Sequence, residues 1–228
     1  MTNEEALEKM ADLWQFLNEK QRCLLSKKLI LRHYKQNEWI YRENDTPNQL
    51  LCLLKGKIKV TKCGITNRNQ IIRVVKPIEY FGYRAYFAGE NYVTAASAFE
   101  PSIVGMIPME NILQILNANN RLALFFMREL SIYLGNADSR TLSLTQKHIR
   151  GRLAESLLLL KHSYGFEEDD STLTITPTRE DLANLSNMNT ANAIRTLSDF
   201  AAEGLIAVNG RRITILREDE LKKISRLG

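Results

Sequence analysis

The sequence has few cysteines, no long hydrophobic run and none of the short motifs of common enzymes. Its three cysteines, Cys23, Cys52 and Cys63, form no CxxC pair, which argues against a disulfide framework or a zinc site. Cys52 and Cys63 fall in strand-like sequence, where buried free thiols are usual. No apolar run approaches the ~20 residues of a membrane span. The protein is therefore expected to bind neither a metal nor a membrane.

Signals for secretion and for catalysis are also lacking. Residues 1–14 are acidic and amphipathic, unlike a signal peptide, so we expect a cytoplasmic protein. The chain has no HExxH, P-loop, GxGxxG or Ser-His-Asp pattern. The adjacent acids Glu167 and Glu168 do not suggest acid–base chemistry. The sequence predicts that the protein is not an enzyme, and it predicts no cofactor.

Length and charge leave a DNA-binding protein possible without pointing to one. The 228 residues, 44% of them hydrophobic, allow one or two globular domains. The net charge is +5, yet residues 148–228 hold 11 lysines and arginines against 12 acidic residues. The excess lies in residues 1–147, with 20 basic against 14 acidic residues. Any attraction to DNA by the C-terminal part must therefore come from where its cations are placed.

The stretch from Thr178 to Gly204 has the pattern of two short helices joined by a turn. Thr178 precedes acids that favour a first helical turn, and residues 186–189 are polar turn formers. A second helix is predicted over about 190–202, capped by Asn189 and ended by Gly204. Its expected buried residues are Ile194, Leu197 and Phe200. Such spacing is typical of a helix-turn-helix, whose second helix enters the DNA major groove; a generic helical pair is the alternative.

A hairpin is predicted directly after these helices. Apolar runs at 205–208 and 213–216 flank Asn209-Gly210-Arg211-Arg212. Asn-Gly between such runs is a strong hairpin signal, because both turn positions need positive φ. The hairpin would form a wing beside the second helix, with two arginines at its tip able to reach phosphate.

The first half of the chain changes from helix to short strands. Residues 4–28 have helical spacing, and turn formers such as those at 64–67 separate the runs that follow. Many short strands at this spacing predict an antiparallel barrel or roll. The predicted strands are 29–33, 39–41, 50–54, 58–63, 70–75, 95–99 and 103–107.

Helices are predicted again at 109–116, 121–147 and 149–162. The first half of the long helix is apolar on more than one face, so it must bury two sides. One side can pack on the roll and the other on a second copy, unless both are buried in a single chain. We therefore predict an α+β chain with three parts, 1–116, 117–147 and 148–228.

The order of these elements resembles the CRP/FNR family of bacterial transcription regulators. The matching segments are residues 54–60 and 80–87 of the roll, 151–154 at the junction, and 178–206 with the wing. The resemblance implies a cyclic-nucleotide-binding-like β-roll, a long dimerisation helix and a winged helix-turn-helix. It also implies a homodimer bound to a pseudo-palindromic operator on double-stranded DNA.

The resemblance also assigns the residues that contact DNA and the second copy. Arg195 matches a position that is commonly arginine in the family, where it could pair with guanine. Asn192 could contact adenine or phosphate, or be a solvated helix residue. With the cations of the first helix and the wing, the predicted DNA-binding residues are Arg179, Asn189, Thr190, Ala191, Asn192, Arg195, Arg211 and Arg212. The predicted dimer helix residues are Leu122, Phe126, Leu130, Tyr133 and Ala137.

Effector binding departs from the family's cyclic-nucleotide members. Tyr83 replaces the glutamate that binds ribose, and Val93 replaces the arginine that pairs with the cyclic phosphate. We therefore expect no ordinary cyclic-AMP site, and Arg84 offers an anion contact or is structural. The candidate effector pocket is Gly82, Tyr83, Arg84, Val93 and Thr94. Another small molecule near Tyr83, Tyr86 and Tyr92, or no effector at all, remains open.

The redox-sensing variants of the family fit poorly. A [4Fe–4S] cluster needs four thiolates, and Cys23 is the one cysteine near the N-terminus. His33, His148 and His162 have no context diagnostic of a haem ligand.

The sequence thus predicts a homodimeric, sequence-specific DNA-binding transcription regulator, with an unidentified small effector in the roll as an option. The acidic loop 167–170 is a candidate contact for RNA polymerase, or simply a solvated loop. The alternative is a ligand-binding sensor that acts on a partner protein without binding DNA.

Overall fold

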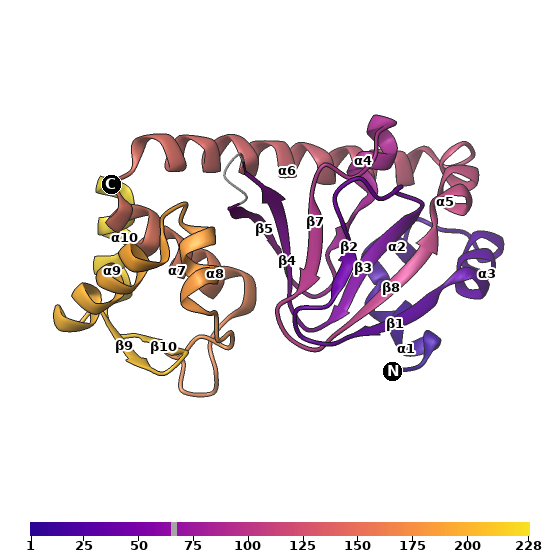
Figure 1. Ribbon diagram of the computed structural model, residues 1–228. Coiled ribbons are helices and arrows are strands. Elements are labelled where there is room, and N and C mark those ends of the chain that lie inside the picture. The colour runs from indigo at the N-terminus through magenta and orange to yellow at the C-terminus, as the bar shows by residue number, and fades with distance from the viewer. Residues whose placement is uncertain (65–67) are drawn as a thin grey trace. The chain divides into compact units, whose positions relative to one another are not determined.

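The computed structural model describes residues 1–64 and 68–228, so most of the predicted turn at 64–67 lies outside the described residues (Figure 1). The chain divides into two compact units. The first comprises Met1–Lys62 and Val75–Asn136, and the second Cys63–Val74 and Ala137–Gly228. Both contain helices and strands, as expected for an α+β chain. The three-part division at 116 and 147 stays a prediction.

Three helices open the first unit where the sequence predicted one. They are α1 (Asn3–Lys9), α2 (Ala11–Trp14) and α3 (Glu19–Lys28). The prediction of one helix over 4–28 was wrong because local caps interrupt it. Asn18 forms a capping box with Gln21, in which each side chain accepts from the other residue's backbone N–H. Helical spacing of apolar residues continues across this break, so periodicity alone did not detect it.

Two four-stranded antiparallel sheets form the roll. The first has the order β1 (Ile30–Tyr34), β8 (Ser102–Pro108), β3 (Gln49–Lys55), β6 (Tyr80–Phe81). The second has the order β2 (Trp39–Tyr41), β7 (Ala95–Ala98), β4 (Ile58–Cys63), β5 (Asn69–Val75). The seven predicted strands are confirmed to within one residue at each end. The short β6 and the helix α4 (Tyr83–Ala88) were not predicted as elements.

Strand β3 is buried on both faces, which explains its unbroken apolar run. Leu50, Cys52 and Leu54 belong to the core cluster shared with the flanking helices. Leu51 and Leu53 point to the opposite face, since side chains alternate along a strand, and they too are buried. Burial raises the pKa of the Cys52 thiol to about 12. Cys63, expected to be buried, is exposed at the end of β4.

Two helices follow the last strand of the roll. Helix α5 (Met109–Leu116) has the predicted bounds, and α6 (Asn120–Gln146) differs from its prediction by one residue at each end. The start of α6 is aromatic on its inner side. The ring of Phe126 lies 5.2 Å from that of Tyr83 and 5.7 Å from that of Phe87. This side of α6 is therefore part of the first unit's core.

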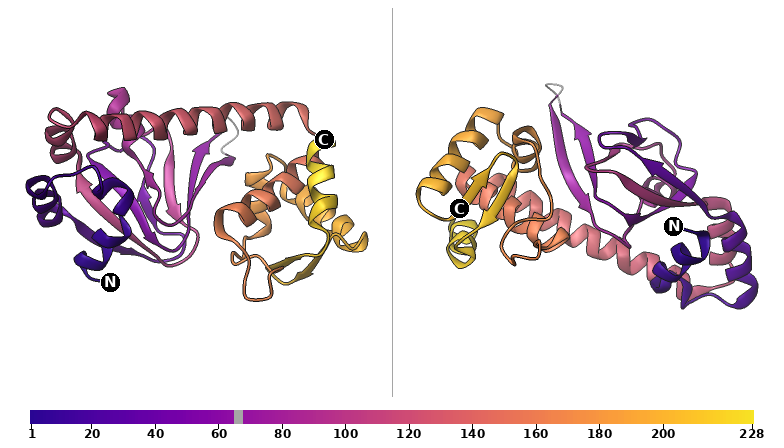
Figure 2. Two further views of the ribbon diagram at one scale, coloured as in Figure 1. Left: turned by 180° about the vertical axis from the view of Figure 1, so that it is seen from behind. Right: turned by 90° about the horizontal axis from the view of Figure 1, so that it is seen from below.

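The second unit contains the predicted helical pair and hairpin. In chain order it has α7 (Ile149–Tyr164), α8 (Arg179–Leu185), α9 (Thr190–Ala202), β9 (Ile206–Asn209), β10 (Arg212–Ile215) and α10 (Glu218–Leu227). The last helix was not predicted; it packs along α7 (Figure 2). Gly151 of α7 allows this approach, because a Cβ there would lie 2.6 Å from the backbone of Gly228.

Candidate DNA-binding site

The first helix of the pair begins at a capping box. The Thr178 hydroxyl accepts from the Asp181 backbone N–H at 3.0 Å, and the Asp181 carboxylate accepts from the Thr178 backbone N–H at 3.1 Å. The turn after α8 is closed by Asn187 in the left-handed region, with φ of 49°. Met188 is buried beneath it. The spacing of polar caps in the sequence therefore fixes both the start of α8 and the turn.

Helix α9 presents a polar, exposed side next to its N-terminus. Asn189 caps it, with its side-chain oxygen accepting from the Asn192 backbone N–H at 2.7 Å. Thr190, Ala191 and Arg195 are exposed, and Asn192 is half-buried. The five residues predicted to read DNA on this helix thus lie at one end of it and remain accessible, apart from part of Asn192.

One predicted core residue of α9 was wrong. Leu197 and Phe200 are buried, but the Ile194 side chain is 47% exposed. The buried stripe instead begins at Ala193, four residues before Leu197, which matches the turn of a helix. Ile194 lies beside Arg195 on the exposed side. It adds apolar surface next to the predicted reading residues.

A glycine cap, an ion pair and hydrogen bonds to backbone carbonyls hold the far end of α9. Gly204, with φ of 66°, ends the helix as predicted. Arg217 donates to the carbonyls of Glu203 and Gly204, the latter at 3.1 Å. Arg150 donates two hydrogen bonds of 2.8 Å to the Glu203 carboxylate, which raises the pKa of Arg150 and lowers that of Glu203. The sequence analysis did not identify these contacts, which join residues far apart in the chain.

The wing is present, but its turn lies one residue later than predicted. Arg212 pairs with Asn209, so the two-residue loop is Gly210-Arg211. Gly210 has φ of 60°, whereas Asn209 belongs to β9 and has no positive φ. A glycine at the first loop position suits a type II′ turn. The predicted hairpin is therefore correct, and its predicted Asn-Gly turn is not.

The four predicted DNA-contacting arginines have different surroundings. Arg179 donates to the Gly210 carbonyl at 2.8 Å and so braces the wing from the start of α8. Arg212 forms an ion pair with Glu167. Arg195 and Arg211 are exposed, on α9 and at the wing tip. Two of the four cations are thus engaged within the protein.

Hydrogen bonds from the next residues along the chain hold part of the acidic loop at 167–170. The Asp169 carboxylate accepts from the Thr172 hydroxyl at 2.6 Å and from the backbone N–H groups of Thr172 and Ser171, at 2.7 and 3.0 Å. These hydrogen bonds, that of the hydroxyl above all, lower its pKa to about 2. Glu168 and Asp170 are exposed. The loop is therefore more than a run of solvated acids.

The predicted effector residues lie around α4 in the first unit. Tyr83 is buried against the aromatic side of α6, and Arg84 pairs with Glu90 at 2.6 Å. Val93 is exposed. Thr94 lies 3.5 Å from the Tyr41 hydroxyl. The replacement of glutamate by Tyr83 has thus turned that position into core packing, and the charge of Arg84 already has a carboxylate partner.

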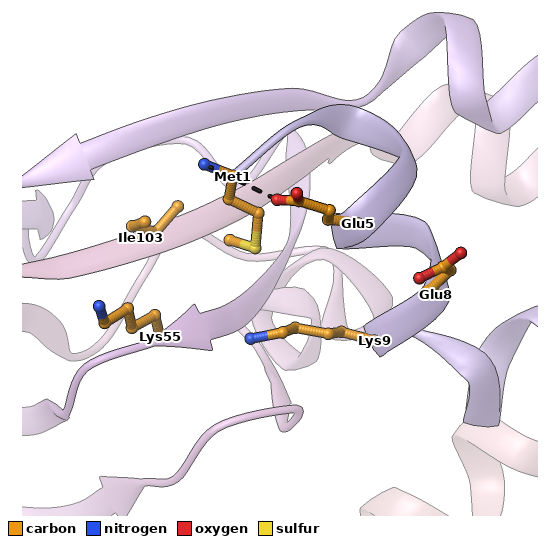
Figure 3. A pocket seen from close by; sticks show the side chains of 6 residues that line it. All are labelled: Met1, Glu5, Glu8, Lys9, Lys55 and Ile103. Carbon is orange, nitrogen blue, oxygen red and sulfur yellow. Dashed lines mark ion pairs between the residues drawn. The ribbon is translucent and has the colours of Figure 1, made fainter.

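A separate hollow of about 480 Å³ lies between the N-terminal helix and the roll (Figure 3). Its lining includes Lys9, Lys55 and Ile103, and none of the predicted effector residues. Among the residues that the structure describes, no His, Cys, Asp and Glu side chains gather into a group that could hold a metal ion. In the same residues, no helix combines the length and apolarity needed to cross a bilayer.

The predicted dimer residues lie on the inner side of α6. Leu122 and Phe126 are buried in the core of the first unit, and Leu130 packs against it. Tyr133 and Ala137 are half-buried on the same side. Periodicity identified two apolar sides of this helix but not which one the chain itself covers, so Leu122 and Phe126 are corrected to intramolecular core.

The other side of α6 carries exposed apolar residues. They recur with the helix and form a stripe on one face: Leu124, Met127, Leu134 and Leu142. We call these four residues the α6 stripe. Large exposed apolar side chains in a row are typical of a protein interface. Their spacing was visible in the sequence, but their exposure was not.

Comparisons with known proteins agree with this architecture. Residues 31–119 match the model of the cyclic nucleotide-binding domain, and residues 151–224 match that of the Crp-like helix-turn-helix domain. The chain belongs to the CRP/FNR family. CRP/FNR proteins are DNA-binding transcription regulators and not enzymes, and this chain is such a regulator.

Individual relatives within the CRP/FNR family are distant. The anaerobic regulatory protein of Bacillus subtilis is 25% identical over 84% of this chain and 82% of its own length. The CRP-like cAMP-activated global transcriptional regulator of Mycobacterium tuberculosis is 22% identical over 89% of this chain and 91% of its own length. The structure of FixK2 from Bradyrhizobium japonicum aligns with a TM-score of 0.77 at 19% identity, covering 86% of this chain and 96% of that one.

Proposed function

We propose that the protein acts as a homodimer whose two α9 helices bind the two halves of a pseudo-palindromic operator. The observation that carries this proposal is the exposed, polar N-terminal end of α9. In helix-turn-helix dimers the second helices enter successive major grooves, about one helical turn apart. CRP/FNR regulators bind DNA as dimers.

Within each half, Arg195 is the principal base-reading residue. Its guanidinium is exposed on α9 and can donate two hydrogen bonds to guanine, worth about 1–3 kcal/mol of discrimination. Thr190 and Ala191 offer short side chains suited to a thymine methyl. Asn192 has part of its surface accessible, and its amide can reach adenine or phosphate. Arg211 supplies a phosphate contact from the wing tip.

The dimer forms through the α6 stripe. These side chains are already solvent-exposed in the single chain, and covering them with a second copy of the same helix would bury apolar surface. The inner side of α6 is occupied by the roll's own aromatic residues. The two sides of the helix thus have different partners.

Any effector differs from cyclic AMP. Tyr83 and Val93 supply no carboxylate for a ribose and no cation for a cyclic phosphate. Another small molecule bound near α4, or ligand-independent binding to DNA, fits these residues better. Because its target is chromosomal DNA, the regulator works in the cytoplasm, with RNA polymerase as a second partner. The exposed acids Glu168 and Asp170 are candidates for that contact.

Selection of genomic DNA fragments by the purified, ligand-free protein tests this function. We expect enrichment of a two-half-site motif, unchanged by added cyclic AMP. Enrichment that appears only with cell extract would show that an effector is obligatory. No enrichment with or without extract would contradict DNA binding and favour a sensor that acts on a partner protein.

A further inference from the structure

An ion pair on the wing partly neutralises one of the wing's two arginines. Arg212 is the first residue of β10, directly after the Gly210-Arg211 loop. Its guanidinium donates to the carboxylate of Glu167. The Arg212 side chain is 57% exposed and that of Glu167 33% exposed. A cation at the predicted DNA surface therefore already has an anionic acceptor.

Glu167 is held in place by its own loop. Its backbone N–H donates to the Thr172 carbonyl at 2.7 Å, and its carbonyl accepts from the Asp170 N–H at 3.1 Å. Thr172 in turn contacts β10, because its hydroxyl lies 2.8 Å from that of Thr214. The Asp169 carboxylate accepts from the Thr172 hydroxyl at 2.6 Å. These contacts fix the acidic loop to the strand that bears Arg212.

This anchoring distinguishes the pair from an ordinary surface ion pair. Two long, unrestrained side chains lose entropy when they meet, which offsets most of the attraction. Here the backbone on both sides is already ordered, so less entropy is lost. The Glu167 carboxylate is also the more shielded partner. Arg212 thus remains paired while the wing is free in solution.

Resting on the proposed function, we propose that Glu167 limits the wing's affinity for the DNA backbone by competing with phosphate for Arg212. Each phosphate neutralised by a protein cation releases counterions and strengthens binding regardless of base sequence. A carboxylate that occupies Arg212 removes one such contact and adds a negative charge near phosphate. Glu167 acts through Arg212 and is therefore a positioning residue. Its effect is to suppress sequence-independent binding relative to operator binding.

The test compares Glu167→Gln with Glu168→Gln on a duplex of random sequence, across a series of salt concentrations. Both variants remove one negative charge from the same loop, but only the first removes the charge that is paired with Arg212. We expect Glu167→Gln to bind three- to five-fold more tightly. Its plot of log affinity against log salt should be steeper by about 0.9, the increment for one more phosphate contact. Glu168→Gln should keep the wild-type slope.

A double-mutant cycle with Arg212→Gln completes the test. The gain from Glu167→Gln should vanish in the Arg212→Gln background. Equal behaviour of the two glutamine variants, or weaker binding by Glu167→Gln, would overturn the proposal while leaving DNA binding intact. If neither the wild type nor any variant bound DNA, the proposed function itself would fail. A thermal melt of each variant checks that the second unit is folded.

Discussion

At the scale of single residues, Asn189 has both a role in stability and a proposed role in DNA binding. It caps α9 through the 2.7 Å hydrogen bond to Asn192, and it lies at the end of the helix that is proposed to enter the groove. A capping side chain typically contributes about 1 kcal/mol, and aspartate caps as well as asparagine does. The two roles of this residue can therefore be separated by substitution.

We expect Asn189→Ala to lower the free energy of unfolding by about 1 kcal/mol, a fall in Tm of roughly 2–4 °C. Asn189→Asp should keep the wild-type Tm but bind DNA more weakly, because its carboxylate would face phosphate. Thermal melts and DNA titrations of both variants measure this. A stable alanine variant would contradict the capping role, and tight DNA binding by the aspartate variant would contradict the placement at DNA.

Residue chemistry also decided which local features the sequence could predict. Caps and glycines act through neighbouring backbone, so Thr178, Asn189 and Gly204 could be assigned from sequence alone. The prediction of an Asn-Gly turn was wrong because the register of a hairpin depends on the whole strand pair, and here that register places Asn209 in β9. Long-range partners such as Glu167 and Arg212 leave no pattern in the sequence.

At the scale of elements, α10 is, like α4, a helix that the sequence analysis did not predict. It is joined to α7 by the ion pair between Lys161 and Glu218, at 2.5 Å, and Lys222 lies 3.0 Å from the same carboxylate. Hydrogen bonds from Lys161, then from Lys222, hold the pKa of Glu218 below its usual range. This pair gives the docking of α10 a pH dependence.

A carboxyl group whose pKa is lowered on folding stabilises the protein above its unfolded pKa of about 4.3, and the contribution is lost as pH falls through the folded pKa. We expect Glu218→Gln to lower the Tm by at most about 3 °C near pH 7, since such pairs contribute ~0–1 kcal/mol. The difference should close below about pH 4.

Thermal melts from pH 3 to 7 measure this, with Glu168→Gln as a control that removes a carboxylate from an exposed loop. A difference between wild type and Glu218→Gln that stayed constant with pH would contradict the ion pair. The same loss of Tm in the control would assign it to net charge instead.

Whether a whole helix or strand could be predicted depended on how regularly its buried residues recur in the sequence. Most strands were predicted because alternating or fully apolar runs match their buried faces, and α5 was predicted at its observed bounds. Residues 4–28 were predicted as one helix, because periodicity continues across the cap at Asn18. Helix α10 has acids in its first turn and Leu221, Ile224 and Leu227 at helical spacing, but it is short and has few apolar residues, and the sequence analysis did not assign it.

At the scale of the whole molecule, the α6 stripe is proposed to hold two copies together. Leu134 is 63% exposed within it. We expect Leu134→Glu to yield a monomer, because the two copies would place carboxylates in an apolar contact. Asn136→Glu adds the same charge at an exposed residue outside the stripe and should remain dimeric. Light scattering after size-exclusion chromatography measures the mass of each.

The affinity for DNA is a second measurement that tests dimerisation. Linking two half-site contacts raises affinity by a factor on the order of 10² or more. The monomeric Leu134→Glu variant should therefore lose at least that factor on the operator. A dimeric variant with wild-type affinity would show that the second copy binds elsewhere on the chain.

The central claim is that α9 reads base sequence through Arg195. The most direct measurement is the affinity of wild type and Arg195→Ala for the selected operator and for a scrambled duplex of the same composition, at one salt concentration. Arg226→Ala, which removes an exposed arginine from α10, is the control. The account predicts that Arg195→Ala loses about 1–3 kcal/mol on the operator and little on the scrambled duplex. An equal loss on both duplexes, or none on the operator, would contradict it.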